Sequence, residues 1–234
     1  MERFTRLLPD RAGELEAADL AAAVPGPAPD GRPFLLVNMI ATADGRATIA
    51  GRTGPIANRA DYELFHALRT RVDAVMVGAE TVRVEGYGPM EPRAVLVTRS
   101  ARVPAGVGLL RAPENRVIVL TPSGDATLPR SAAQVSYLRA PLAEGVRRLR
   151  TEHGVRSVLC EGGPRLLGDL VRAGLVDELH LVIAPKLAAG PDPITIVSGG
   201  ALDPPVDLEL LSLHESGGYL FLRYGAGPPR AVRP

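Results

Sequence analysis

The sequence predicts an α/β protein with a mostly parallel sheet, helices on both faces and an antiparallel hairpin at its carboxyl end. Short apolar runs alternate with amphipathic segments from Phe34 onward, which is the order of parallel strands joined by helices. The last two apolar runs are separated only by the Ser-Gly-Gly of residues 216–218, a turn typical of a hairpin. A chain of 234 residues, 46% of them hydrophobic, is long enough to bury one complete core.

The first buried strand is preceded by an extension and a proline-rich linker, which together form residues 1–33. Residues 14–24 can form a short helix, and the alternating prolines of residues 25–29 are typical of a semi-rigid linker. The main domain is expected to span residues 34–225. The Gly-, Pro- and Arg-rich residues 226–234 are expected to form a flexible tail.

The elements of the main domain follow from their apolar patterns. Each predicted strand is a short apolar run, and each predicted helix repeats apolar residues at three-to-four spacing. Asn58 stands before the helix 59–71 as a side chain that can cap it. The predicted strands are 34–40, 72–77, 94–98, 117–121, 135–138, 157–160, 176–184, 206–215 and 219–224. The predicted helices are 59–71, 79–84, 141–153 and 164–173.

A long polar loop, residues 41–58, follows the first strand of the main domain. A loop of this length in a compact domain is usually functional. Ligands of parallel sheets lie outside the carboxyl ends of the strands. We therefore expect this loop to meet residues 78–81, 98–99 and 161–163 at one crevice.

The strand 157–160 ends in Glu161, and two glycines and Pro164 follow. Glycines permit a sharp turn and the close approach of a ligand, and proline suits the first position of a helix. The free N–H groups at that helix start can bind a phosphate. Glu161 beside them can hold a polar group of a second ligand. This pattern predicts an enzyme with a phosphorylated cofactor or substrate.

Composition argues against several classes of partner. A net charge of +1, 4% aromatic residues and no Trp give no sign of a nucleic-acid surface. The single cysteine, Cys160, excludes an intrachain disulfide, and the four histidines lack the spacing of metal ligands. No apolar run reaches the roughly 18 residues of a membrane span, and no signal-peptide core is present. We expect no metal, no nucleic-acid or membrane partner, and a cytoplasmic location.

Four ordered motifs resemble the reductase domain of bacterial riboflavin biosynthesis, the RibD carboxyl-terminal domain family. Residues 38–46 are similar to the first strand and loop of that family, and residues 78–89 to its G-x-x-T-V-x-x-D/E element. Residues 161–179 resemble its EGG…L…GLVDEL signature, and residues 184–187 its APK element. The resemblance covers about residues 33–224.

The resemblance implies a dihydrofolate-reductase-like fold, a homodimer and NADPH as cofactor. The implied reaction reduces 5-amino-6-(5-phosphoribosylamino)uracil, a small phosphorylated pyrimidine, to its ribitylamino product. In that reaction the ribose ring opens and hydride reaches its first carbon, while the protein positions the reactants and excludes water.

The resemblance also implies two sets of contacts at the crevice. A proton must reach the opened sugar or the imine, and Glu161 and Asp44 are the candidate catalytic residues, directly or through water. The implied substrate contacts are Asn38, Thr53, Arg69 and Glu161. The implied NADPH contacts are Ala41, Pro55, Thr81, Glu85, Thr98, Arg99, Gly162, Gly163, Pro164, Arg165, Leu166 and Leu167.

Several of these residues also have a structural interpretation. Arg99 can be a solvated turn residue rather than the partner of a 2′-phosphate, and Arg69 can serve the carboxyl end of its helix. Asp44 can orient its own loop, and Asn38 can be a cross-strand hydrogen-bonding residue. The family's Asp-Pro-x-Leu is replaced by Gly86–Pro89, which leaves the identity of the substrate open.

Two other functions remain open. A dihydrofolate-reductase-like enzyme that reduces a pterin could use Asp61 as its proton donor, although Asp61 can equally serve the helix dipole. A non-catalytic protein that binds NADPH would also fit the glycine motif together with the altered loop at Gly86–Pro89.

Overall fold

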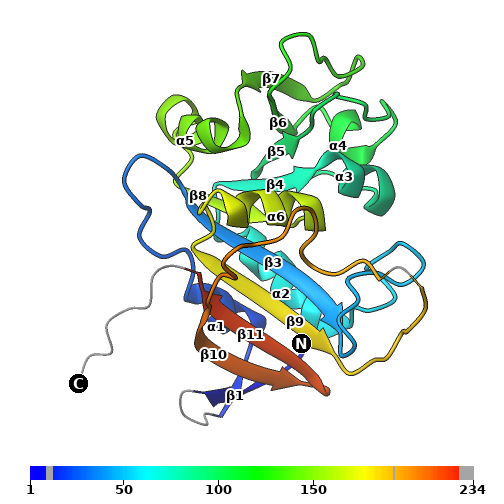
Figure 1. Cartoon of the computed structure of the whole chain (residues 1–234), viewed down its shortest axis with the longest axis vertical. Coiled ribbons are helices and arrows are strands. Elements are labelled where there is room, and N and C mark those ends of the chain that lie inside the picture. The colour runs from blue at the N-terminus through cyan, green and yellow to red at the C-terminus, as the bar shows by residue number, and fades with distance from the viewer. Residues whose placement is uncertain (9–12, 192, 227–234) are drawn as a thin grey trace.

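The structure is built on an eleven-stranded sheet with the order β2-β1-β10-β11-β9-β3-β8-β4-β5-β6-β7 (Figure 1). The computed structural model describes residues 1–8, 13–191 and 193–226. The strands are β1 (Phe4–Leu8), β2 (Glu14–Leu15), β3 (Phe34–Thr42), β4 (Ala74–Gly78), β5 (Arg93–Val97), β6 (Arg116–Thr121), β7 (Gln134–Arg139), β8 (Ser157–Cys160), β9 (Glu178–Ala184), β10 (Glu209–Ser216) and β11 (Tyr219–Gly225). The helices are α1 (Ala17–Ala22), α2 (Arg59–Arg69), α3 (Ala79–Glu85), α4 (Gly108–Arg111), α5 (Leu142–His153) and α6 (Pro164–Arg172).

The neighbouring strands from β9 through β3, β8, β4, β5 and β6 to β7 are all parallel, which confirms the predicted parallel sheet. β3 lies between β9 and β8 and is buried along its whole length. It has strands on both sides and helices over both faces, so none of its side chains needs to face water. This position explains why its sequence is a continuous apolar run rather than an alternating one.

The predicted carboxyl-terminal hairpin is confirmed. β10 and β11 pair antiparallel, and β11 adds antiparallel to β9. Gly217 and Gly218 connect them with φ values of +59° and +82°, a region that glycine enters without steric cost. The hairpin therefore extends the parallel sheet on the side of β9 (Figure 1).

Helices cover both faces of the sheet, as predicted. α5 and α6 pack on one face over a core that includes Leu35 and Val158. α1 and α2 pack on the opposite face against Leu36 and Leu159. α3 and α4 pack on that second face near Leu96. Side chains of adjacent residues in β3 and β8 thus enter different cores, as the alternation of a strand requires.

The amino-terminal segment is part of the sheet, which the sequence did not predict. No strand was expected before Phe34, yet β1 pairs with β10 and buries Phe4 completely against Phe221, at 4.8 Å between ring centroids. α1 is shorter than the expected helix over residues 14–24, because Glu14 and Leu15 pair with β1 instead. The expected tail, from residue 227 onward, lies outside the described residues.

Parallel pairing places the carboxyl ends of β3, β4, β5 and β8 at the same edge of the sheet. The long loop after β3 and the start of α6 meet at this edge, as expected. None of the described helices is long and apolar enough to cross a membrane. Within the described chain, no group of three or more His, Cys, Asp or Glu side chains could hold a metal ion.

Candidate active site

A cavity of about 710 Å³ opens at this edge of the sheet. Its walls come from α2, α3, the start of α6, the loop between β3 and α2, and residues 193–198. The cavity brings together most of the predicted site residues. Those that line it are Asn38, Thr53, Arg69, Thr81, Glu85, Glu161, Gly163, Pro164 and Arg165.

The glycine turn between β8 and α6 is tightly packed. Gly162 has a φ of +80°, and its carbonyl accepts a hydrogen bond of 2.8 Å from the Gly78 N–H. A Cβ atom on Gly163 would lie only 2.9 Å from the hydroxyl oxygen of Thr81. The turn therefore brings the backbone against the start of α3. α6 begins at Pro164 with no side-chain cap, so its first N–H groups remain available to an anionic ligand.

Glu161 is held in place by two side chains. Its carboxylate accepts hydrogen bonds of 2.7 and 2.8 Å from the Arg69 guanidinium and of 2.7 Å from the Tyr87 hydroxyl. The Glu161 side chain is only 2% exposed. Burial and the neighbouring Glu161 charge raise the pKa of Tyr87 well above its ordinary value, so Tyr87 stays a hydrogen-bond donor. Glu161 is thus a fixed acceptor at the cavity wall.

Arg69 owes its position to packing as well as charge. It lies on the last turn of α2, and its guanidinium stacks over the Phe65 ring at 4.1 Å from the ring centroid. Hydrogen bonding and attraction to Glu161 outweigh desolvation and raise the pKa of Arg69. Arg69 therefore forms an ion pair with Glu161 and does more than interact with the dipole at the end of its helix.

Tyr87 is a site residue that the sequence did not identify. It follows the left-handed Gly86 at the end of α3, and its backbone carbonyl accepts from the Leu109 N–H at 2.6 Å. The available signal was the departure at Gly86–Pro89 from the family pattern, which places a hydroxyl-bearing ring between two glycines.

Glu85 and Thr53 are brought together as well. The Glu85 carboxylate accepts hydrogen bonds from the Thr53 N–H and hydroxyl at 3.0 and 3.1 Å. This pair ties the loop after β3 to the end of α3 on the cavity wall. If the Glu85 carboxylate contacts a ligand, it does so while it also holds this loop in place.

Asp44 is placed outside the cavity lining. Its carboxylate accepts from the Thr42 hydroxyl and from the backbone N–H groups of Ala188 and Ala189. These hydrogen bonds lower the pKa of Asp44 to about 2. The structure thus gives Asp44 a loop-orienting role, and of the two predicted catalytic residues only Glu161 lines the cavity.

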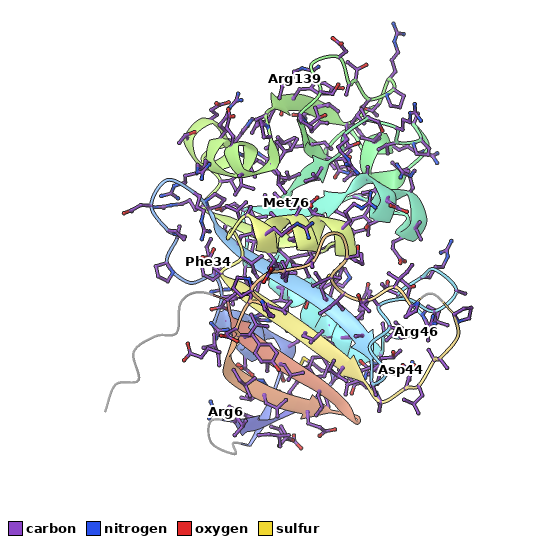
Figure 2. The ribbon with its side chains drawn as sticks, viewed as in Figure 1. Arg6, Phe34, Asp44, Arg46, Met76 and Arg139 are labelled. Atoms are coloured by element: carbon purple, nitrogen blue, oxygen red, sulfur yellow. The ribbon has the colours of Figure 1, made fainter. Side chains whose placement is uncertain are left out.

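Residues 186–191 and 193–200, which we call the strap, connect two walls of the cavity. At one end the Arg46 guanidinium donates hydrogen bonds to the carbonyls of Gly190 and Pro191, and the Asp44 carboxylate accepts one from the Ala189 N–H. Figure 2 shows Asp44 and Arg46 near the carboxyl end of β3. At the other end the Ser198 N–H donates to the Pro164 carbonyl at 3.1 Å. Between these ends the strap contributes residues 193–195 and 198 to the lining.

The other predicted cofactor residues lie around the cavity rather than on its walls. Ala41 is buried in β3, and Leu166 and Leu167 belong to the core beneath α6. Pro55 is exposed on the loop after β3. These positions favour a backbone or structural contribution over direct side-chain contact.

Thr98 and Arg99 follow β5 at the same edge of the sheet. The buried Thr98 hydroxyl accepts a hydrogen bond of 3.0 Å from the Ala101 N–H and fixes this turn. Arg99 is exposed, so its guanidinium is available to a ligand that extends beyond the cavity.

Fold and cavity define an α/β protein that places an uncapped helix amino terminus beside a fixed carboxylate. The chain belongs to the RibD C-terminal domain family, whose model matches residues 33–221. This match includes the glycine turn, Glu161 and the loop after β3.

Two curated relatives place the chain within that family. It is 30% identical over 203 residues to the 2,5-diamino-6-ribosylamino-4(3H)-pyrimidinone 5′-phosphate reductase of Methanothermobacter thermautotrophicus, covering 79% of this chain and 93% of that protein. It is 27% identical over 168 residues to the riboflavin biosynthesis protein RibD of Aquifex aeolicus, covering 67% of this chain and 47% of that protein. Both relatives are thus named for riboflavin biosynthesis or for a reduction within it.

Solved structures share the fold. A pyrimidine reductase-like protein of Corynebacterium diphtheriae superposes with a TM-score of 0.72 at 22% identity, covering 92% of this chain and 100% of that one. The shared fold therefore covers nearly the whole chain.

Proposed function

We propose that this protein catalyses the NADPH-dependent reduction of a 5-phosphoribosylaminopyrimidine to its ribitylamino product in riboflavin biosynthesis. The observation that carries the proposal is Glu161, held by Arg69 and Tyr87 directly before the glycine turn. This arrangement places a carboxylate that can bind a sugar next to a helix start that can bind an anion, within one cavity. The reductase names of the relatives support the same reaction.

The residues at the glycine turn fit a dinucleotide diphosphate. Gly163 leaves open the space that a Cβ would occupy next to Thr81, and the first N–H groups of α6 are free of side-chain caps. Arg99 is exposed beyond this turn and suits a 2′-phosphate through its charge and fork geometry. When bound there, the nicotinamide cofactor supplies the hydride.

The substrate side of the cavity is suited to a sugar. Arg69 and Tyr87 fix the Glu161 carboxylate, whose remaining lone pairs can accept hydrogen bonds from ribose hydroxyls. Asn38, buried at the floor, has a side-chain oxygen with no hydrogen-bond partner within the described chain. A hydroxyl or amino group of the substrate would satisfy it.

The proposal is tested by following NADPH oxidation with the purified full chain. The substrates are 5-amino-6-(5-phosphoribosylamino)uracil, the 2,5-diaminopyrimidinone counterpart named for the relative, and dihydrofolate. We expect turnover with at least one pyrimidine and a loss of about 100-fold or more in Glu161→Gln. Turnover of dihydrofolate alone would favour the pterin reductase, and tight NADPH binding without any turnover would favour the non-catalytic protein.

We also propose a homodimer, as the family resemblance implies, and a cytoplasmic location, as expected from the sequence. Sedimentation of the full chain at micromolar concentration would test the assembly, and a sedimenting monomer would contradict it.

A further inference from the structure

Asp61 is an acid on the cavity wall whose carboxyl group accepts no hydrogen bond within the described chain. It lies in the first turn of α2, where its backbone N–H donates to the Asn58 side chain at 2.9 Å. That bond already caps the helix start, so the carboxyl group is not needed as a cap. Asp61 lines the same cavity as Glu161 and Thr81.

The other carboxylates that line this cavity are differently placed. Glu161 is held by Arg69 and Tyr87, and Glu85 accepts two hydrogen bonds from Thr53. Glu80 is exposed to solvent on α3. Among the described residues, Asp61 is therefore the one partly buried acid on the wall that no neighbouring side chain or backbone group holds as an acceptor.

Burial gives Asp61 the protonation behaviour of an acid that works near neutral pH. Desolvation raises its pKa from 3.8 to about 6, because an ionised carboxylate loses hydration that nothing at this wall replaces. Within the part of the chain that the structure describes, the other charged groups that line the cavity are Glu80, Glu85, Glu161, Arg69 and Arg165. His66, one turn further along α2, has a pKa lowered by burial and by Arg69.

We propose that Asp61 is the general acid of the reduction, an inference that rests on the proposed function. The Asp61 carboxyl group gives its proton to the ribose ring oxygen while the bond from that oxygen to the first sugar carbon breaks. The nitrogen lone pair forms the carbon–nitrogen double bond of an iminium ion, which then takes up the hydride. One proton and one hydride are consumed, the cofactor is oxidised, and solvent reprotonates Asp61.

The test compares Asp61→Asn with Glu63→Gln in the full chain. Both changes remove one carboxylate from α2, but Glu63 bonds to the backbone of Glu2 and to Arg59 outside the cavity. We expect Asp61→Asn to lower kcat about 100-fold or more with KM changed less than about threefold. Glu63→Gln should stay within about twofold. A kcat for Asp61→Asn above about one third of wild type would overturn the proposal.

Thermal unfolding separates a chemical role from a structural one. An acid whose pKa is higher in the folded state stabilises that state below about pH 3.8, and this contribution is lost as the pH rises through about 6. Asp61→Asn should therefore melt at a higher temperature than wild type at pH 8 and should lose that advantage at pH 4. A lower melting temperature at pH 8 would show that Asp61 stabilises the fold.

A direct titration makes the outcome independent of turnover. The carboxyl carbon of Asp61, assigned by its loss in Asp61→Asn, should titrate near pH 6 in ¹³C NMR spectra of the unliganded protein. Titration near pH 4 would overturn the general-acid role even in an active enzyme. Failure of the wild-type chain to reduce either pyrimidine, with the NMR titration still near pH 6, would instead reject the proposed function.

Discussion

At the scale of single residues, the site depends on a carboxylate that three donor atoms immobilise. Glu161 is almost completely buried, and a buried charge is tolerated only when it is paired and hydrogen-bonded. Arg69 neutralises the charge, and Tyr87 completes the hydrogen bonding. The cost of burying this charge is thus offset by the same hydrogen bonds that fix the position of the side chain.

Tyr87→Phe removes one of these donors without changing the volume of the ring. We expect a loss of about 1.5 kcal/mol in the free energy of unfolding, because hydrogen bonds to charged groups contribute roughly 1.5–3 kcal/mol and Arg69 still holds Glu161. KM for the pyrimidine should rise, since the carboxylate then loses one of the three donors that fix its position. Urea unfolding and steady-state kinetics measure both effects. Tyr224→Phe, on β11, is the control, and equal effects of the two substitutions would contradict the role of Tyr87.

Arg99→Ala tests the cofactor phosphate. An exposed guanidinium that binds a 2′-phosphate should contribute about 1.4 kcal/mol, or tenfold in affinity. We expect KM for NADPH to rise about tenfold while KM for NADH is unchanged. Arg147→Ala, an exposed arginine of α5, should change neither constant. A parallel rise in both constants after Arg99→Ala would argue against selective recognition of the 2′-phosphate.

The sequence pattern predicted Glu161 and the glycine turn at the crevice, because a strand end followed by two glycines and a proline has few alternative geometries. Arg69 was expected there from the family resemblance. Tyr87 could not be predicted in the same way. Its direction depends on the left-handed turn at Gly86 and on the backbone contact with Leu109. Neither feature has a local periodic pattern. Asp44, in turn, was separated from the cavity by hydrogen bonds to Ala188 and Ala189, residues remote in the sequence.

At the scale of elements, α2 carries Asp61 and Arg69 and is braced by the amino-terminal segment. The Glu63 carboxylate accepts from the Glu2 N–H, and the Arg71 side chain donates to the Val24 carbonyl. α1 and α2 share one core with Phe4 and Phe221. The segment before the family-matched region thus supports a helix of the candidate site.

Phe4→Ala measures this support. Removing a completely buried Phe side chain should lower the free energy of unfolding by about 3–5 kcal/mol, through lost burial and the cavity that remains. Leu8→Ala, on the same strand but 41% exposed, should cost less than about 1 kcal/mol. Chemical denaturation measures both variants. Equal costs would mean that β1 contributes through its backbone pairing alone.

The strands and most helices of the main domain could be predicted from the sequence, whereas β1 and the short helix α4 could not. The strands from β3 onward are apolar runs separated by clear turn residues, so local patterns define them. β1 is only five residues long, and its partner β10 lies about two hundred residues away in the sequence. Long-range pairing decides its conformation, which a local window does not contain.

At the scale of the whole molecule, the candidate site lies at the carboxyl ends of the central strands of one continuous sheet. β3, β8 and β4 are buried almost throughout, while the outer strand β7 is mostly exposed or half-buried. β2, at the opposite edge, has only two residues. The strands that end at the cavity are therefore the most strongly enclosed ones.

Hydrogen exchange should follow this gradient. Amides of β3 and β8 should exchange most slowly, because opening them requires disruption of both faces of the core. Amides of β7 and β2 should exchange first. Mass spectrometry after deuterium labelling of the full chain measures the order. Exchange of β7 as slow as that of β3 would show that the sheet opens only as a unit.

The strap has one further consequence. It joins the loop after β3 to α6, and the described strap residues in the cavity lining, residues 193–195 and 198, carry no charged side chain, so these residues act on a ligand through size and shape. The tethers at Asp44 and Arg46, which do not themselves line the cavity, can therefore alter the room left for a ring system without changing the residues on the cavity wall.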